Sequence, residues 1–171
     1  MSETSPSPSN LAGIAPESYL ANRLLEAGEI TDTEHSFLVN ELERRGREPR
    51  TRPLSAIQVL EQSGFKKLVD VLLFLARDSA TPLLPLSRFG AQKAAYSLVP
   101  RDYLTERGAL PFGTLESAVL VALLNPYDKA LREQVQNASG RSCKFYLVKA
   151  SEYDAALSRI VETESRDVAQ A

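Results

Sequence analysis

The sequence predicts an α+β fold, in which a helical subdomain of about four helices precedes a small α/β subdomain with a short β-sheet flanked by helices. Two observations lead to this fold class. Apolar residues in the first half recur at helical spacing, in runs that end at glycines. In the second half, an apolar run of strand length at 117–124 ends in Asn-Pro and is followed by a helical run, another strand-like run and a last helix.

The composition along the chain divides it into four segments. Residues 1–15 are rich in Ser and Pro and are expected to form a disordered tail. We expect the helical subdomain at 16–78, the α/β subdomain at 82–162 and a flexible polar tail at 163–171. With 171 residues, of which 43% are hydrophobic, the chain is long enough to bury a core of its own.

The helices of the first half are predicted from their ends. Gly28 and Gly64 each follow a helical run, at the place where a helix commonly stops. Thr31 and Glu34 have the spacing of a capping box, which marks the start of a helix. The helices expected in this half begin at Pro16 and near Thr31, Leu54 and Phe65.

The second half changes to short strands and helices. Strands are expected at 109–112 and 117–124, with a turn between them at Gly113-Thr114. A helix that stops at Gly140 should connect them to a further strand with alternating residues. The remaining elements are expected at 92–98, from Pro100 to Gly108, at 127–138, at 143–148 and at 151–162.

Charge and composition exclude several classes of protein. The net charge of −2 gives no sign of binding to nucleic acid or to a membrane surface. The longest apolar runs, VDVLLFLA and AVLVALL, are far shorter than the roughly 18 residues that a membrane helix requires, so no membrane insertion is expected. The single cysteine, Cys143, excludes an internal disulfide and favours a cytoplasmic location.

No constellation of reactive residues appears in the sequence. Gly108 and Gly113 have the glycine spacing of a nucleotide-triphosphate loop, but Thr114 stands where that loop needs a lysine. A metal site built from the only histidine, His35, and the distant Cys143 has no other support. We therefore expect no catalytic residue, no metal, no cofactor and no enzymatic activity.

The one unusual feature of the charge distribution is a group of five arginines within nine residues, at the end of the second expected helix and in the loop that follows it. They could form an anion site for a phosphate-bearing ligand or an acidic partner. The alternative, which we favour, is a solvated loop whose charges interact with the end of a helix. The cluster comprises Arg44, Arg45, Arg47, Arg50 and Arg52, and the candidate anion- or nucleotide-binding residues are Arg23, Arg44, Arg45, Arg47 and Arg52.

Four segments, taken in order, resemble a known family. They are LLEAGEIT at 24–31, LLFLARDSATPLLPL at 72–86, LVPRDYLTERGALPF at 98–112 and VALLNPYD at 121–128. Together they are similar to the N-terminal domain of type II secretion and type IV pilus assembly ATPases, the bacterial GspE/MshE N-terminal domain family. The resemblance extends from about Tyr19 to Ile160, and the Asn-Pro-Tyr-Asp turn is its most specific part.

The resemblance implies a function by contact. In the family this domain precedes a motor ATPase and contacts a cytoplasmic membrane-platform protein. No Walker lysine is present here, so if the chain is complete we expect a stand-alone domain. We expect a non-catalytic interaction or regulatory module whose partner is a membrane-platform protein or an ATPase of a secretion or pilus machine.

The resemblance also suggests an alternative function, the sensing of cyclic di-GMP or another phosphate ligand. Some family members bind this dinucleotide through two tandem motifs that begin Arg-Leu-Gly. Here Tyr19-Leu20-Ala21 and Ser55-Ala56-Ile57 stand at the two triplets, so both arginines and both glycines are missing. Arginine would pair with a phosphate or a guanine edge, and glycine would allow close approach, so we expect the binding motifs to be degenerate.

Overall fold

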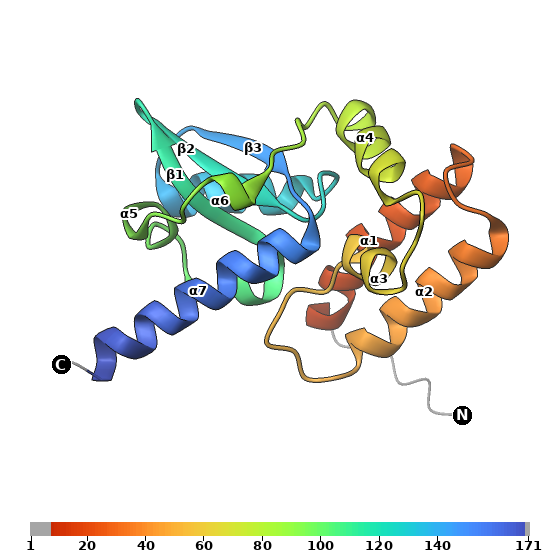
Figure 1. Ribbon diagram of the computed structural model, residues 1–171, viewed down its shortest axis with the longest axis horizontal. Coiled ribbons are helices and arrows are strands. Elements are labelled where there is room, and N and C mark those ends of the chain that lie inside the picture. The colour runs from red at the N-terminus through yellow and green to blue at the C-terminus, as the bar shows by residue number, and fades with distance from the viewer. Residues whose placement is uncertain (1–7, 170–171) are drawn as a thin grey trace.

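A computed structural model describes residues 8–169 of the chain and confirms the predicted α+β fold class (Figure 1). Four helices lie together on one side of the molecule, and the sheet with its flanking helices lies on the other. The first group consists of α1 (Pro8–Glu26), α2 (Asp32–Gly46), α3 (Ala56–Gln62) and α4 (Leu68–Asp78). Residues 1–7 and 170–171 lie outside the described residues.

The α/β half begins after a short extended segment. It consists of a 3₁₀ turn η1 (Leu86–Arg88), α5 (Lys93–Tyr96), a π-helical turn η2 (Tyr103–Arg107), β1 (Ala109–Leu115), β2 (Ala118–Leu123), α6 (Lys129–Ser139), β3 (Cys143–Leu147) and α7 (Ala150–Ala169). The sheet has the order β1-β2-β3. Strands β1 and β2 are antiparallel, and β2 and β3 are parallel with α6 as the crossover between them.

The hairpin turn lies later than the sequence suggests. The expected turn at Gly113-Thr114 is wrong, because both residues belong to β1 and the chain reverses after Leu115. The register between β1 and β2 shifts between Pro111 and Gly113. Glycine inside a strand often marks such an irregularity. Gly113, which suggested a turn, therefore marks the shift of register instead.

Two helices extend beyond their expected ends. Helix α1 begins at Pro8 rather than at Pro16, which lies inside it, and the preceding run includes Leu and Ala, two good helix formers. Helix α7 continues to Ala169, through residues expected to be a flexible tail. Ion pairs Arg101–Glu164 and Lys93–Asp167 tie its last turns to the rest of the α/β half. The division into subdomains stays a prediction.

A single hydrophobic core runs through both halves of the described chain. Helix α3 contributes four buried residues and contacts α1 and α2 on one side and α7 on the other. The Tyr153 side chain of α7 is fully buried, and its hydroxyl donates a 2.7 Å hydrogen bond to the Leu104 carbonyl. The largest fully buried side chains come from both halves: Leu20, Leu24, Leu38, Leu42, Ile57, Leu60, Leu72, Leu75, Leu86, Leu104, Phe112 and Tyr153.

Candidate functional site

The same backbone turn occurs at two places in the helical half. Gly28 ends α1 and Gly64 ends α3, and both have φ of +74°, in the left-handed region that favours glycine. After each glycine the next N–H donates back to the helix, from Glu29 to the Leu24 carbonyl at 2.9 Å and from Phe65 to the Leu60 carbonyl at 3.1 Å. These are the bonds of the Schellman motif, so both helix stops expected from the sequence are confirmed.

A groove of about 710 Å³ lies between the two glycine turns. We call it the glycine-turn groove. Its apolar lining comes from the turn before α2, from α2 itself, from the end of α3 and from the turn after α3, and Phe37 of α2 is 48% exposed there. The volume falls within the roughly 300–1,000 Å³ typical of ligand sites. The apolar residues that line it are Ile30, Phe37, Leu60 and Phe65.

The charged groups at the rim of the groove differ in whether they already have a partner within the chain. The carboxylate of Glu34 accepts the Thr31 backbone N–H at 2.9 Å, which completes the predicted capping box of α2. Lys66 and Lys67 are exposed, and neither forms an ion pair within residues 8–169. Glu29 also lines the groove. The two lysines suit acidic groups of a partner, and the apolar side chains between the charges suit its apolar groups.

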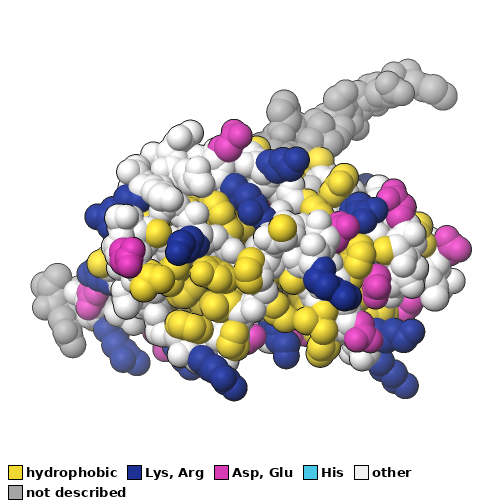
Figure 2. Space-filling view, turned by 90° about the horizontal axis from the view of Figure 1, so that it is seen from above, with side chains coloured by type: hydrophobic (Ala, Val, Ile, Leu, Met, Phe, Trp, Pro, Cys, Tyr) yellow, Lys and Arg dark blue, Asp and Glu magenta, His cyan; other side chains and the backbone are white. Residues whose placement is uncertain are grey.

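Exposed apolar side chains also occur elsewhere. On the face shown in Figure 2, they gather into patches with Lys and Arg side chains at their margins. Val69 and Leu73 lie one turn apart on α4 and are about half exposed, at 55% and 45%. Helix α4 thus buries one side, through Val71, Leu72 and Leu75, and leaves an apolar stripe on another.

The candidate arginines are largely engaged with carboxylates. Arg44 pairs with Glu41 at 2.9 Å and with Glu48 at 3.0 Å, and Arg45 pairs with Glu41 at 3.2 Å. The hydrogen bond from Arg44 is the main reason that the pKa of Glu41 lies below its usual range. These pairs follow the i,i+3 and i,i+4 spacing of one helix face.

The other arginines of the cluster lie around the loop that follows α2. Arg52 pairs with Asp154 of α7 at 3.2 Å and donates to the Ser158 hydroxyl at 3.0 Å. Arg45, Arg50 and Arg52 line a small pocket of about 170 Å³, and Arg47 is exposed. The structure thus brings three of the arginines to one pocket, with carboxylates already bound to two of them.

Arg23 belongs to a separate polar cluster that joins the two halves. Its guanidinium binds both carboxylate oxygens of Asp78 at 3.1 and 2.8 Å, and Tyr127 of the Asn-Pro-Tyr-Asp turn donates its hydroxyl to Asp78 at 2.7 Å. The Arg23 hydrogen bonds, then that from Tyr127, hold the pKa of Asp78 below its usual range. Tyr19 packs edge-on against the Tyr127 ring, with 5.2 Å between ring centroids.

Glu17 is the functional candidate that sequence reasoning missed. It is only 4% exposed, and its Oε2 accepts the Ala56 N–H at 2.7 Å while its Oε1 accepts the Asn125 side-chain amide at 3.1 Å. Burial raises its pKa to about 7. The only sequence signal was the Asn-Pro-Tyr-Asp turn, whose asparagine side-chain oxygen also accepts the Tyr127 N–H at 2.9 Å.

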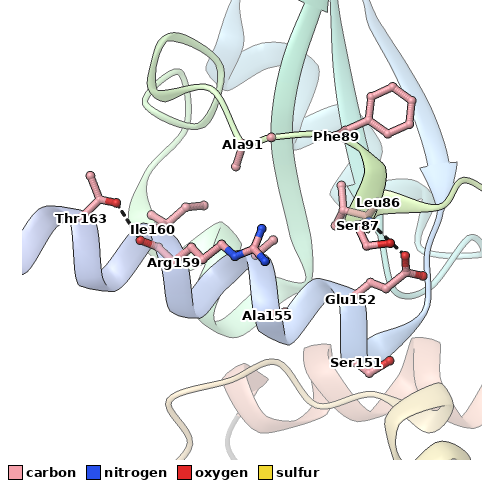
Figure 3. A pocket seen from close by; sticks show the side chains of 12 residues that line it. Leu86, Ser87, Phe89, Ala91, Ser151, Glu152, Ala155, Arg159, Ile160 and Thr163 are labelled. Carbon is pink, nitrogen blue, oxygen red and sulfur yellow. Dashed lines mark hydrogen bonds between the residues drawn. The ribbon is translucent and has the colours of Figure 1, made fainter.

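A second groove runs between α7 and residues 86–91, with a volume of about 260 Å³ (Figure 3). Ala155 and Ile160 of α7 are among its lining residues, and Glu152 accepts the Ser87 backbone N–H at 3.0 Å. The Arg159 side chain runs along α7 toward Ala155. The groove holds the carboxylate of Glu152, which is already bonded, and the exposed guanidinium of Arg159.

The two residues considered as metal ligands lie in unrelated surroundings. His35 shares a 2.8 Å hydrogen bond with Asn22, and Cys143 is a half-buried thiol in β3 whose pKa is raised by burial. Among residues 8–169, no group of three His, Cys, Asp or Glu side chains is placed to hold a metal ion. In the same part of the chain, the helices are too short or too polar to span a bilayer.

Comparison with known proteins gives a family match and a fold match. The model of the MshEN domain matches residues 79–167. A solved structure described as MshE with cdg covers 82% of this chain and 96% of its own, with 22% identity and a TM-score of 0.53. A structure of the N-terminal domain of XpsE covers 84% and 94%, with 20% identity and a TM-score of 0.51. No curated protein matches the chain.

Proposed function

The chain belongs to the MshEN domain family, and from this premise we propose that it is a non-catalytic module that docks a protein of a secretion or pilus assembly machine. The glycine-turn groove carries this proposal. Its lining combines aromatic and aliphatic side chains with two lysines that form no ion pair within residues 8–169, and with two glutamates, Glu29 and Glu34. Such a surface offers binding energy through apolar burial and orientation through charge.

The chemistry of the groove indicates what the partner segment should present. Apolar anchors would bury Phe37 and its neighbours, and acidic side chains would lie near Lys66 and Lys67. A membrane-platform protein or an ATPase of the machine, with a segment of this type facing the cytoplasm, is the partner we expect. The proposal places the chain in the cytoplasm with it.

Replacement of Phe37 by Ser tests the docking proposal. Calorimetry would measure binding of the purified chain to the cytoplasmic part of the membrane-platform protein and to the ATPase of the machine. A buried aromatic anchor is worth about 2 kcal/mol or more, so affinity should fall at least roughly 30-fold. Val161→Ser is the matched control, because Val161 is 43% exposed but lies on α7.

The lysines give a second, independent readout. Charge reversal at Lys66 and Lys67 should weaken the same complex and reduce its dependence on salt, since exposed charge pairs are screened. Docking at this groove is contradicted if Phe37→Ser and Val161→Ser bind equally well. It is also contradicted if the unaltered chain binds neither protein at concentrations up to about 1 mM, the weak end of the affinity scale.

A phosphate-ligand sensor is the second candidate function. Two lysines beside Phe37 and Phe65 would suit a ligand with phosphates and flat rings, and a solved relative carries cdg. Against it, the triplets expected to begin with arginine begin here with Tyr19 and Ser55, and Ser55 is buried. The groove, rather than those triplets, is therefore the place where we would look for such a ligand.

Thermal denaturation with cyclic di-GMP distinguishes the two candidates. Ligand at about 100 times its dissociation constant adds about 2.7 kcal/mol of stability, which corresponds to a melting shift of roughly 5–10 °C for a chain of this size. The shift should disappear when Lys66 and Lys67 are both replaced by Ser. No shift at millimolar ligand would rule out cyclic di-GMP as a ligand of the chain.

A further inference from the structure

We propose that Glu17 is a proton-operated lock between the helical half and the α/β half, closed when its carboxyl group is protonated and easier to open when the group is ionised. This regulation goes beyond the proposed docking function and does not depend on which partner binds. It concerns a buried acidic group that neither groove uses.

The lock rests on where the two carboxyl oxygens lie. One oxygen accepts a backbone N–H from Ala56, the first residue of α3, and the other accepts a side-chain N–H from Asn125, which is 108 residues away along the chain. Glu17 itself is on α1. One buried side chain thus connects two helices of the helical half to the turn that precedes α6.

The charges around Glu17 disfavour an ionised carboxylate. Asp128, at the start of α6, is the titratable group that acts on it from the α/β half, and its charge is of the same sign. On its own helix, Arg23 is already bound to Asp78 and Glu26. No cation pairs with Glu17 in the described chain, so burial outweighs the two hydrogen bonds.

The direction of the pH response follows from these surroundings. In the closed state burial raises the pKa of Glu17 from 4.5 to about 7, whereas an opened, hydrated carboxyl group returns to the lower value. Between these two values the open state releases a proton that the closed state keeps. The equilibrium constant for opening therefore increases as the pH rises through this window, by at most about tenfold per pH unit, and reaches a plateau above neutrality.

Opening would change how the two halves are held together. The first amide of α3 and the Asn-Pro turn lose their shared acceptor at the same time. The glycine-turn groove lies entirely on the helical half, so its position relative to the sheet would vary with pH. Acidic conditions would hold the module in one arrangement, and neutral conditions would let it adapt.

Amide hydrogen exchange of Ala56, measured by NMR between pH 5 and pH 8, tests the lock directly. The quantity compared is the protection factor, which removes the intrinsic dependence of exchange on pH. In the unaltered chain it should fall by more than about tenfold from pH 5 to pH 7. In Glu17→Gln, whose side chain cannot titrate, it should stay within about twofold, and in the control Glu133→Gln, exposed on α6, it should fall as in the unaltered chain.

A second measurement needs no variant at position 17 that might destabilise the fold. The side-chain carboxyl carbon of Glu17, labelled with ¹³C, reports its own titration, and a midpoint within about one unit of pH 7 is expected. A midpoint near 4.5 overturns the proposal. So does a protection factor for Ala56 that is constant in the unaltered chain, or one that falls equally in Glu17→Gln.

Discussion

Replacing Gly28 or Gly64 by Ala should isolate the energetic cost of a left-handed backbone. Both glycines have φ of +74°, and a Cβ added at either would meet no atom within 4 Å. The cost is therefore conformational, about 1–2 kcal/mol for an L-residue in this region. Restriction of the unfolded chain returns about 0.4–1 kcal/mol, so each variant should lose about 1 kcal/mol of unfolding free energy.

Gly90 provides the matched control, because an added Cβ there also meets no atom within 4 Å while its φ lies outside the left-handed region. Gly90→Ala should be neutral or gain up to about 1 kcal/mol. Urea unfolding followed by circular dichroism measures all three variants, and the melting temperature should fall by about 2–4 °C per kcal/mol lost. Gly28→Asn should lose less than Gly28→Ala, since Asn tolerates the left-handed region.

The double variant tests whether the two turns are independent. If they are, its loss should equal the sum of the single losses to within about 0.5 kcal/mol. Equal stabilities for Gly28→Ala and Gly90→Ala would refute the reasoning, because an added Cβ meets no atom within 4 Å at either site and only Gly28 has a left-handed backbone. A loss above about 3 kcal/mol at Gly28 or Gly64 would also refute it, since strain of that size requires a steric clash.

Three further outcomes are expected. Tyr153→Phe should cost about 1–2 kcal/mol in urea unfolding, because the buried Leu104 carbonyl loses its donor, and a loss below about 0.5 kcal/mol would contradict this. The unfolding free energy of the unaltered chain should decrease by up to about 3 kcal/mol as pH rises from 4.5 to 7, at about 1.36 kcal/mol per pH unit. The reason is that folded Glu17 keeps a proton that the unfolded chain releases. In Glu17→Gln this dependence on pH should disappear. Asp78 has a lowered pKa beside Arg23, so its contribution is present above pH 3.8 and lost as pH falls further; melting curves of Asp78→Asn should show a weaker decline in acid.

The parts of the fold that were predictable depend on neighbouring residues. Thr31 and Glu34 form the expected capping box, and Gly28, Gly64 and Gly140 end helices as expected. Each signal acts within a few residues, so a linear sequence contains all of it. The β-α-β-α order was predictable for the same reason, since apolar runs and glycine stops define each element locally.

The candidate sites depend on residues that the fold brings together from far apart. Nothing near Glu17 in the sequence indicates that Asn125 will bind it, and nothing near Phe37 indicates the groove formed with Phe65. The arginine cluster shows the opposite case. Its charge was visible in the sequence, but the carboxylates that engage it, such as Asp154 from α7, were not.

The continuous core has a consequence for how the chain could be divided. The region matched by the family model starts at Ser79, after the last residue of α4, and α3 packs on α7 across that boundary. A fragment cut at that boundary would open the buried sides of Leu157 and Ile57 to water, because neither half has a closed apolar surface of its own. Expression of both halves in one chain should therefore be needed for the fold.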